Sequence, residues 1–512
     1  MRLIQTIDYA AIAPPVIVAS TGVVVLVADL FVGRAARRMV AFVLSMIGTL
    51  AALGSAAWLA RSSTRRTLCL PDGCSYVADD FTLFFQLLFL SVLVVVLLMS
   101  LAGVAQDNMP PGEYHALLLW SASGMLVLAA ARDLLSLLIA LEVVSLPAFV
   151  LVGLKRDDAR SAEAALRFFL FSVVSTALTA YGIALLYGVT GHITLSGIAD
   201  ALGRQHAHPG AMSALAATAV VLVVAGFAFK VSAVPFHFWT PDTYEGAPVP
   251  IAAFLSVASK AAGFAGLLIL LLQGFRDYAD VWGVVIAVLA AVTMTVGNLV
   301  ALRQWHLVRL LAWSTVAQAG YLLMPLGVAA TSGGRSAHAL HLATQATLTY
   351  LAIYAAMNLG AFACVVAIAR RFPRLAISDV RGLARAAPWL AVAFALFLTA
   401  LAGLPPGVAG LFAKVVVLRA AVQGHVTWLA VVAAVNTVIG LAYYLRVAAV
   451  MFVAEAEPAS REAAAAESPA RRRHLATTVG IVVATAAVVV LSVYPQPVLD
   501  WASHAASLAG PR

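Results

Sequence analysis

Three lysines in apolar surroundings are the residues of this sequence best suited to chemistry. The chain has four lysines and 28 arginines, yet Lys230, Lys260 and Lys414 all lie in long apolar runs. A charge at the centre of a bilayer costs at least about 3 kcal/mol, so it tends to persist only where it functions or pairs. A buried lysine can release and regain a proton, whereas arginine effectively stays charged. We therefore predict a proton relay; a static ion pair or a snorkelling side chain is the structural alternative.

The spacing around the first two lysines places them at similar depth. Lys230 lies ten residues before a loop that starts near Thr240, or about 15 Å along a helix. Lys260 lies 13 residues after the end of that loop near Ala247, or roughly 20 Å. Both depths fall near the middle of an apolar layer about 30 Å thick. Two charged lysines on adjacent antiparallel spans repel each other, and this repulsion makes it easier for either one to lose its proton.

One acidic and one further basic position accompany the lysines. Glu142 lies about mid-span and is the deepest acidic residue, so it is the natural counter-charge. The alternative is a static partner of a basic neighbour, although a pair that opens and closes can also gate protons. Arg167 lies nearer the start of its span, with Glu163 four residues before it, a spacing that favours a local pair. Arg167 is therefore predicted as an ion-pair partner and is a weak candidate for a proton carrier.

The composition identifies the elements that hold these residues as membrane helices. Of the 512 residues, 63% are hydrophobic and only 11% are charged, whereas soluble domains have roughly 25% charged residues. Apolar runs of about 20 residues, long enough to span the hydrocarbon layer, recur along the chain. The net charge of +9 comes from basic residues in short loops, which is a topology signal and argues against nucleic acid as a partner. We predict an all-α polytopic protein embedded in a lipid bilayer.

Fourteen spans are predicted. They are 14–32, 39–60, 81–103, 114–131, 134–153, 164–188, 213–239, 248–272, 280–301, 306–329, 341–369, 388–419, 425–452 and 475–494. Because the number is even, both termini share one side, and the loops of the other side hold 17 Lys and Arg residues against nine. The positive-inside rule then places both termini outside. Cys69 and Cys74, in the loop 61–80, would lie outside as well, where a disulfide is permitted.

Interrupted helices predict an internal repeat. The seventh span has Lys230 followed by Pro235, and the twelfth has Gly403 and two prolines followed by Lys414. Proline frees backbone carbonyls, and paired broken helices in the two halves of a transporter mark the transport path. Because these spans are five apart, we predict two inverted five-helix repeats, spans 4–8 and 9–13. The predicted domains are a three-helix segment, 1–113, the repeats 114–272 and 280–452, and a charged linker with a final helix, 453–512.

A long motif that contains Lys230 resembles a known family. The segment 229–248 reads FKVSAVPFHFWTPDTYEGAP and resembles the signature of the subunit N family of bacterial NADH–quinone oxidoreductase, respiratory complex I. Its Thr-Pro-Asp-x-Tyr-Glu-Gly-Ala-Pro form differs from the sister subunits M and L, which typically have Leu-Pro-Asp-Ala there. The segment around Glu142 and the segments 311–321, 403–414 and 443–446 match as well, so the resemblance covers nearly the whole chain.

The resemblance implies 14 helices with inverted repeats and a proton channel that is driven by electron transfer from NADH to quinone. By position, it implies that the relay consists of Glu142, Lys230, Lys260 and Lys414. Arg167 stands where the family usually has a lysine that pairs with the glutamate.

Three further positions follow from the resemblance. His237 matches a motif histidine near the inner surface, for which a structural role is as well supported as proton uptake. Arg309 and Gln318 stand where related subunits commonly have lysine and histidine, so a titratable group in the tenth helix is not expected.

The resemblance also assigns cofactors and partners. The family's FMN, iron–sulfur clusters, NADH site and quinone site lie on other subunits, and this chain has no cysteine cluster and no Gly-rich nucleotide fingerprint. We therefore expect no cofactor and no metal on this chain. The implied partners are the other membrane-arm subunits and, through them, the peripheral arm. The implied location is the bacterial inner membrane.

Two other function classes remain open from the sequence. A subunit of a multisubunit sodium/proton antiporter would share the glutamate and the lysines, although the loop 239–248 argues against it. A membrane subunit of a related hydrogenase-type complex, transporting or not, would share the fold. The buried lysines argue against a pure scaffold, but they do not identify the module that supplies electrons.

Overall fold

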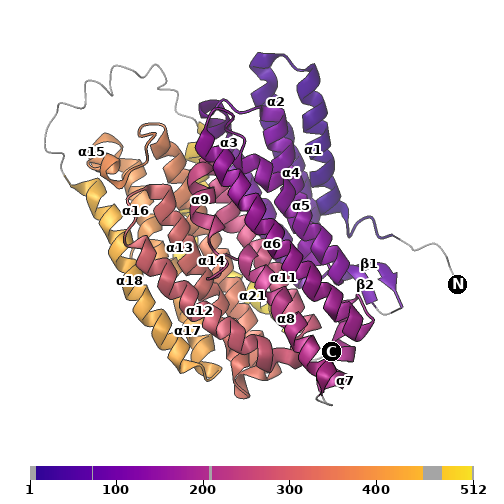
Figure 1. Ribbon diagram of the computed structural model, residues 1–512. Helices are drawn as coiled ribbons and strands as arrows, with labels where there is room; N and C mark the ends of the chain where they lie inside the picture. The colour runs from indigo at the N-terminus through magenta and orange to yellow at the C-terminus, as the bar shows by residue number, and fades with distance from the viewer. Residues whose placement is uncertain (1–6, 72, 207–209, 454–474, 510–512) are drawn as a thin grey trace.

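The computed structural model describes residues 7–71, 73–206, 210–453 and 475–509, which form a bundle of long helices with a small hairpin at one end (Figure 1). The first half contains α1 (Ala13–Phe31), α2 (Arg34–Leu59), β1 (Arg65–Leu70), β2 (Gly73–Ala78), α3 (Asp80–Gln106), α4 (Pro111–Ala130), α5 (Leu134–Val152), α6 (Ala159–Thr190), α7 (Leu195–His206), α8 (Ala211–Lys230) and α9 (Trp239–Gly246). One long span follows as α10 (Val249–Phe254), η1 (Leu255–Ser259), α11 (Lys260–Ile269) and η2 (Leu270–Gly274).

The second half begins after this span. It contains η3 (Arg276–Tyr278), α12 (Ala279–Ala301), α13 (Leu307–Leu323), η4 (Met324–Ala330), η5 (Gly333–Arg335), α14 (Ala337–Ala369), η6 (Ile377–Val380), α15 (Leu383–Ala386), α16 (Pro388–Ala402), α17 (Val408–Gln423), α18 (Thr427–Phe452), α20 (Leu475–Val493), α21 (Gln496–Ala505) and η8 (Ala506–Ala509).

The predicted class and the broken helices are confirmed. Within the described residues, 12 helices are long and apolar enough to cross a membrane. The 20-residue helix α4 and the pair α16 and α17 stand outside these twelve, and with them the number of segments equals the fourteen predicted. The predicted charged linker, 453–474, lies almost entirely outside the described residues.

Two connections that were predicted as loops contain regular structure. The loop 61–80 forms the antiparallel hairpin β1–β2, in which Cys69 pairs with Cys74 and the two cysteines form a disulfide, which the sequence had left open. The loop 189–212 contains α7, whose buried residues include Leu195, Ile198 and Leu202 at helical spacing. Both elements are too short to produce the long apolar run on which the span prediction rested.

Both ends of the described chain lie at the same end of the bundle. Asp8, before α1, pairs with Arg65 of the hairpin at 3.0 Å. Ser507 of η8 and Arg66 of the hairpin line one common cavity. This arrangement agrees with an even number of spans, and Figure 1 shows the hairpin and α7 at its lower end and the α1–α2 connection and α15 at its upper end. Which end faces outside stays a prediction.

Each of the two broken helices ends just before a residue with a positive φ angle. The seventh span was predicted to continue to residue 239, but α8 stops at Lys230 and Ser232 adopts a positive φ of 65°. The chain becomes helical again only at α9. In the twelfth span, α16 ends at Ala402, and Gly403 has a φ of 84°, a conformation that glycine adopts without a steric penalty. Both breaks therefore leave helix ends inside the bundle.

The span from α10 to η2 forms the centre of the core. Every residue in its most apolar 18-residue stretch is buried, whereas the corresponding stretches of α1 and α2 are 28% and 33% buried. A helix that is apolar on all sides must be covered on all sides by protein. The residue carried by this central helix, Lys260, is therefore shielded from lipid as well as from water.

Candidate functional site: buried lysines and the polar groups between them

Lys230 is the last residue of α8, at the point where the seventh span breaks. It is only 3% exposed, and its Nζ donates a hydrogen bond to Oγ of Ser145 on α5 at 2.7 Å. The Ser145 hydroxyl donates in turn to the carbonyl of Leu141 at 2.6 Å, so its lone pairs are free to accept from the lysine. After the break, Trp239 donates to the carbonyl of Phe229 at 3.0 Å, which holds α9 against the end of α8. The partner of Lys230 is thus a neutral oxygen.

Glu142 lies on α5, three residues before the serine that binds Lys230. It is half-buried, and its Oε1 accepts a hydrogen bond from Oγ1 of Thr176 on α6 at 2.7 Å. Residues three apart share a helix face, so Glu142 and the partner of Lys230 occupy neighbouring positions on α5. Among the described residues, no ion pair joins Glu142 to a lysine or arginine. The predicted counter-charge lies near the relay without being held by a cation.

The resemblance implied that Arg167 would pair with Glu142, but the structure gives Arg167 other partners. Its guanidinium binds Glu163 at 2.5 Å, which confirms the local pair, and Asp242 of α9 at 2.6 Å. The side chain is half-exposed. Glu142 binds Thr176, which lies nine residues, or about 14 Å, further along α6 than Arg167, and this difference in height explains why each residue has other partners.

Lys260 follows a π-helical turn, Leu255–Ser259, in the central span. It is 1% exposed, and its Nζ donates to the backbone carbonyl of Thr315 on α13 at 2.8 Å. Gly263, one turn further along the same face, packs against the stem of Lys230: a Cβ there would lie 3.1 Å from Cγ of that lysine. The stem of Lys230 therefore packs against the central span one turn away from Lys260. Short π-helical turns inside α-helices are frequent at functional sites.

Lys414 binds a backbone carbonyl at the break in the twelfth span. It lies on α17, is 5% exposed, and donates through Nζ to the carbonyl of Ala402 at 2.6 Å. Ala402 is the last residue of α16, so its carbonyl has no following turn of helix to bind it. The ammonium also lies 5.4 Å from the ring centre of Tyr321, a distance at which the ring face attracts a cation. The broken helix supplies the acceptor for this lysine.

Gln318 connects the surroundings of Lys260 with those of Lys414. It lies one turn after Thr315 on α13, and its Oε1 accepts from the hydroxyl of Tyr350 at 2.5 Å. Its Nε2 donates to the hydroxyl of Tyr444 at 3.3 Å and to the carbonyl of Leu401 at 3.4 Å, next to the acceptor of Lys414. Although glutamine does not titrate, it occupies the middle of a continuous polar seam.

Further buried polar groups extend this seam, and sequence analysis did not identify them. Tyr354 donates to the carbonyl of Ser256 at 3.1 Å and to Oγ1 of Thr315 at 3.2 Å. The other members are Ser314, Tyr443, Tyr444, Asn298, Asn436 and Asn358. The available signal was the presence of amides and tyrosines inside apolar spans, because polar groups in a membrane core need partners.

His237 lies in the irregular segment between α8 and α9 and is 5% exposed. Its ring centre is 5.2 Å from that of Trp313 on α13. In the described chain no hydrogen bond joins the His237 ring to the polar seam, and its Nδ1 is buried without a hydrogen-bond partner. Whether it takes up protons stays a prediction.

A cluster of ion pairs holds α9 at its charged face. Asp242 binds Arg167 of α6 at 2.6 Å and Arg309 of α13 at 2.8 Å, and Glu245 binds Arg309 at 2.7 Å. His306, before α13, lies beside this cluster; burial lowers its pKa, although the charge of Glu245 opposes that effect. Through Asp242, the cluster joins helices from both predicted repeats. Arg309 stands where related subunits commonly have a lysine, and in this structure it forms ion pairs with Asp242 and Glu245.

Replacing Asp242 with asparagine is expected to destabilise the packing of α9 by about 1 kcal/mol, because two half-exposed ion pairs are lost and each is worth at most about that amount. The free energy of unfolding, measured for the purified subunit in mild detergent with added denaturant, checks this value. The matched control is Asp277→Asn, at an exposed aspartate without an ion pair in the described chain, where the change should stay within about 0.5 kcal/mol. Equal losses in both variants would contradict the role of the cluster.

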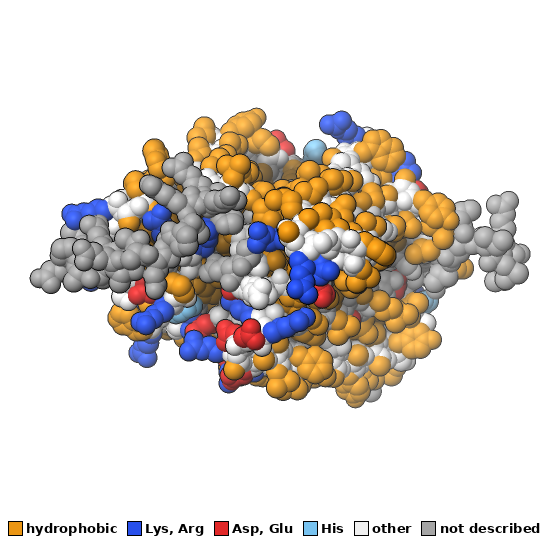
Figure 2. Space-filling model, turned by 90° about the horizontal axis from the view of Figure 1, so that it is seen from above, with side chains coloured by type: hydrophobic (Ala, Val, Ile, Leu, Met, Phe, Trp, Pro, Cys, Tyr) orange, Lys and Arg blue, Asp and Glu red, His pale blue; other side chains and the backbone are white. Residues whose placement is uncertain are grey.

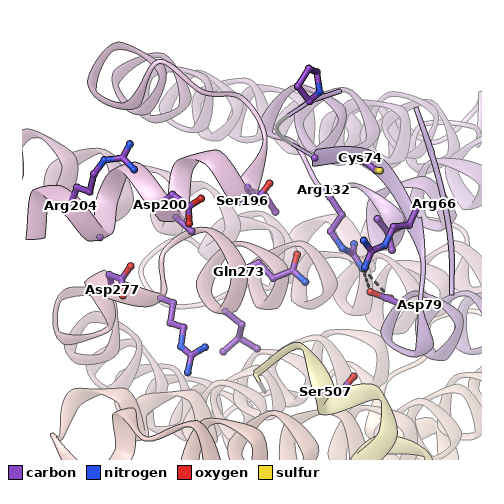
Figure 3. A pocket seen from close by; sticks show the side chains of 18 residues that line it. Arg66, Cys74, Asp79, Arg132, Ser196, Asp200, Arg204, Gln273, Asp277 and Ser507 are labelled. Atoms are coloured by element: carbon purple, nitrogen blue, oxygen red, sulfur yellow. Dashed lines mark hydrogen bonds and ion pairs between the residues drawn. The ribbon is translucent and has the colours of Figure 1, made fainter. Parts of the chain in front are cut away.

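A separate cavity of about 1030 Å³ opens beside the hairpin (Figure 3). Its lining includes Arg66 of β1, Arg204 of α7 and Gln273 of η2, and the pair Arg132–Asp79 at 2.8 Å forms part of its wall. None of the predicted relay residues lines it. Within the described residues, no group of three or more His, Cys, Asp or Glu side chains is arranged to hold a metal ion.

Comparison with known proteins places this arrangement in a family. The family model described as "NADH:quinone oxidoreductase/Mrp antiporter, TM" matches residues 131–440. The chain is 48% identical to NADH-quinone oxidoreductase subunit N 2 of Streptomyces griseus, over 98% of this chain and 94% of that protein. It is 45% identical to subunit N of Salinispora tropica, over 88% and 86% of the two chains.

Solved structures agree in fold. A chain of respiratory complex I from Thermus thermophilus, solved with bound aureothin, is 29% identical with a TM-score of 0.74 and covers 95% of this chain and 98% of its own. A chain of the Mrp complex from Dietzia has a TM-score of 0.81 over 98% of this chain and 96% of its own, but at 21% identity the likeness concerns the fold alone. The chain therefore belongs to the subunit N family of NADH–quinone oxidoreductase, the antiporter-like membrane subunits of respiratory complex I.

Proposed function

We propose that Lys230, Lys260 and Lys414 pass protons along the buried seam, with Glu142 controlling the charge at its first end. The observation that carries this proposal is the nature of the partners: each lysine donates to a neutral oxygen, a hydroxyl or a backbone carbonyl. A lysine in a static ion pair cannot lose its proton without leaving a buried carboxylate unpaired, which is costly. A lysine bound to a neutral oxygen leaves no such charge behind.

The order of the residues supports a continuous path. Gly263, one turn after Lys260, packs against the stem of Lys230, and Lys260 is linked to Lys414 through Thr315, Gln318 and the adjoining carbonyls at the end of α16. Water molecules can complete such a path where hydroxyls and free carbonyls line it. Lys414, next to the second helix break, would release the proton on the far side.

The energy for this transport comes, in our proposal, from electron transfer on other subunits. FMN, the iron–sulfur clusters, NADH and quinone would be bound there, and the other membrane-arm subunits would connect this chain with the peripheral arm. The two repeats would be inverted, both termini would face outside, and the chain would lie in the bacterial inner membrane. Removal of residues from the relay should then change proton transport and electron transfer together, because the two are coupled.

The Lys230→Met variant tests this function. With the intact complex in membrane vesicles, proton uptake driven by NADH should fall to a small fraction of the wild-type rate, because methionine fills the space without carrying a proton. The matched control is Lys155→Met, since Lys155 is the fourth lysine and pairs with Asp107 at 3.3 Å in a connection between helices. Wild-type uptake in Lys230→Met membranes that contain the fully assembled complex would refute the relay.

Co-purification separates the proposed complex from the alternatives. Isolation of the chain together with subunits that contain flavin and iron–sulfur clusters and oxidise NADH would support a respiratory NADH–quinone oxidoreductase. Isolation with transport subunits alone would indicate an antiporter, and isolation with an electron-transfer module that does not oxidise NADH would indicate a related complex. The likeness to the chains of the Mrp complex and of the membrane-bound sulfane sulfur reductase, at 21% and 19% identity, concerns the fold and does not favour either alternative.

A further inference from the structure

A basic cavity at the upper end of the bundle is not used by the relay. Its volume is about 440 Å³, and it lies between the start of α2, the α3–α4 connection and the α5–α6 connection. The charged residues of its lining are Arg34, Arg37, Arg38, Arg156, Asp107 and Asp157. Figure 2 shows this end of the molecule, where basic and acidic side chains gather between hydrophobic surfaces.

The positive charge of this cavity is only partly neutralised by the protein. Arg37 lies 3.9 Å from Asp29 and donates through Nε to the carbonyl of Val32 at 2.9 Å. Asp107 forms an ion pair with Lys155 at 3.3 Å. Three arginines, Arg34, Arg38 and Arg156, have no ion-pair partner in the described part of the chain, and one lining aspartate, Asp157, remains to balance them. An anion is the ligand that this charge distribution favours.

The cavity lies at the height where the apolar surface ends. Leu30 and Phe31, the last residues of α1, are 74% and 83% exposed, and Met39 in the second turn of α2 is 53% exposed. Exposed apolar side chains of this size on a membrane helix are suited to contact with lipid chains. The arginines are next to them in sequence, at the level of the lipid headgroups, where guanidinium groups bind phosphate well.

The position of the arginines on α2 adds a second reason for a bound anion. Arg34, Arg37 and Arg38 occupy the first two turns of a 26-residue helix that has no acidic residue in its first turn and no side-chain cap at Gly33. The N-terminal end of a helix carries a partial positive charge, so placing three arginine cations there is electrostatically unfavourable. A bound phosphate would offset this repulsion.

We propose that this cavity binds the phosphate headgroup of an anionic phospholipid whose acyl chains lie along the exposed faces of α1 and α2. The guanidinium groups of Arg34 and Arg38, which lie on one face of α2, would contact the phosphodiester from one side, and that of Arg156, from the α5–α6 connection, would contact it from another. The proposal does not depend on the proton relay, because no relay residue lines the cavity.

The test uses membranes that contain the intact complex and a photoactivatable phosphatidylglycerol, with crosslinked peptides identified by mass spectrometry. In the wild type, crosslinks should occur on α1 and α2 near Phe31. Excess phosphatidylglycerol should suppress them, whereas phosphatidylcholine and inorganic phosphate should not. The triple variant Arg34→Gln, Arg38→Gln, Arg156→Gln should lower the yield at least about tenfold, because each arginine near the surface contributes to the attraction.

A second triple variant serves as the matched control. Arg303→Gln, Arg374→Gln and Arg381→Gln remove the same charge from exposed positions outside the cavity and should leave the yield unchanged. Equal losses in both triples would overturn the proposal, as would suppression by inorganic phosphate, which would indicate a site for a soluble anion. Phosphatidylglycerol crosslinks on another subunit, with none on α1 or α2, would also overturn it. If the triple variant does not assemble, Arg156→Gln alone, in an exposed connection, should still lower the yield.

Discussion

Replacing Lys260 with methionine is expected to lower NADH-driven proton uptake into membrane vesicles by about a hundredfold or more, the loss typical of removing a positioned proton-transfer group. Lys260 lies in the most buried span, is 1% exposed and binds a backbone carbonyl at 2.8 Å. In the proposed path, a proton that leaves the seam of Lys230 has to cross this position before it reaches Gln318. The measurement is quenching of a pH-sensitive dye in vesicles with equal amounts of assembled complex.

The Lys260→Arg variant separates a fixed charge from a titrating group. Arginine keeps the positive charge but does not release a proton near neutral pH, so this variant should be as impaired as Lys260→Met. Recovery of pumping in Lys260→Arg would mean that a static charge is sufficient and would contradict the relay. Lys155→Met, at a partly exposed lysine outside the relay, should pump at the wild-type rate in the same assay.

Replacing Gly410 with alanine is expected to destabilise the subunit by about 1–3 kcal/mol, as overpacking of a close contact typically does. A Cβ at Gly410 would lie 1.7 Å from the carbonyl oxygen of Ala400 and 2.8 Å from its carbonyl carbon. The obstacle is backbone rather than the end of a flexible side chain, so α17 has to move away from α16. Because Lys414 lies one turn later on α17, its bond to the carbonyl of Ala402 should weaken at the same time.

Two measurements check the Gly410 prediction. The amount of subunit in membranes, determined by immunoblot, and its unfolding temperature in detergent should both fall in Gly410→Ala. The matched control is Gly54→Ala on α2, where a Cβ would meet nothing within 4 Å. This control should be neutral or slightly stabilising, since alanine favours a helix over glycine by about 1 kcal/mol. A wild-type unfolding temperature in Gly410→Ala would show that the two half-helices are not packed as closely as described.

The candidate site shows how far residue types alone can guide a prediction. Lys230, Lys260 and Lys414 could be identified because a lysine in an apolar span is unusual wherever it lies. Their burial is confirmed. The polar seam between them was missed, because tyrosine and glutamine are tolerated in many apolar runs and become conspicuous only when several of them meet. Gln318 illustrates this: its type suggested the loss of a relay group, but its contacts place it between two lysines.

Arg167 and the short elements show the opposite limit. The pair with Glu163 follows from a spacing of four residues and was predicted. The pair with Asp242 joins residues 75 positions apart, so it depends on how α6 packs against α9. The hairpin β1–β2 and the helix α7 lie in connections whose local sequence has no long apolar run, and they gain stability from the bundle and, for the hairpin, from the disulfide.

The sequence by itself determined the class of the protein, the number of spans, the two helix breaks and the positions of the buried lysines. These properties follow from the length of apolar runs, from proline and glycine, and from the free energy of placing a charge in hydrocarbon, all of which are local. Only the tertiary structure decided what each lysine binds, that Glu142 is held by Thr176, and that Arg167 and Arg309 converge on Asp242. The reason is physical: a hydrogen-bond partner depends on the height and rotation of neighbouring helices, and packing between segments distant in sequence sets both.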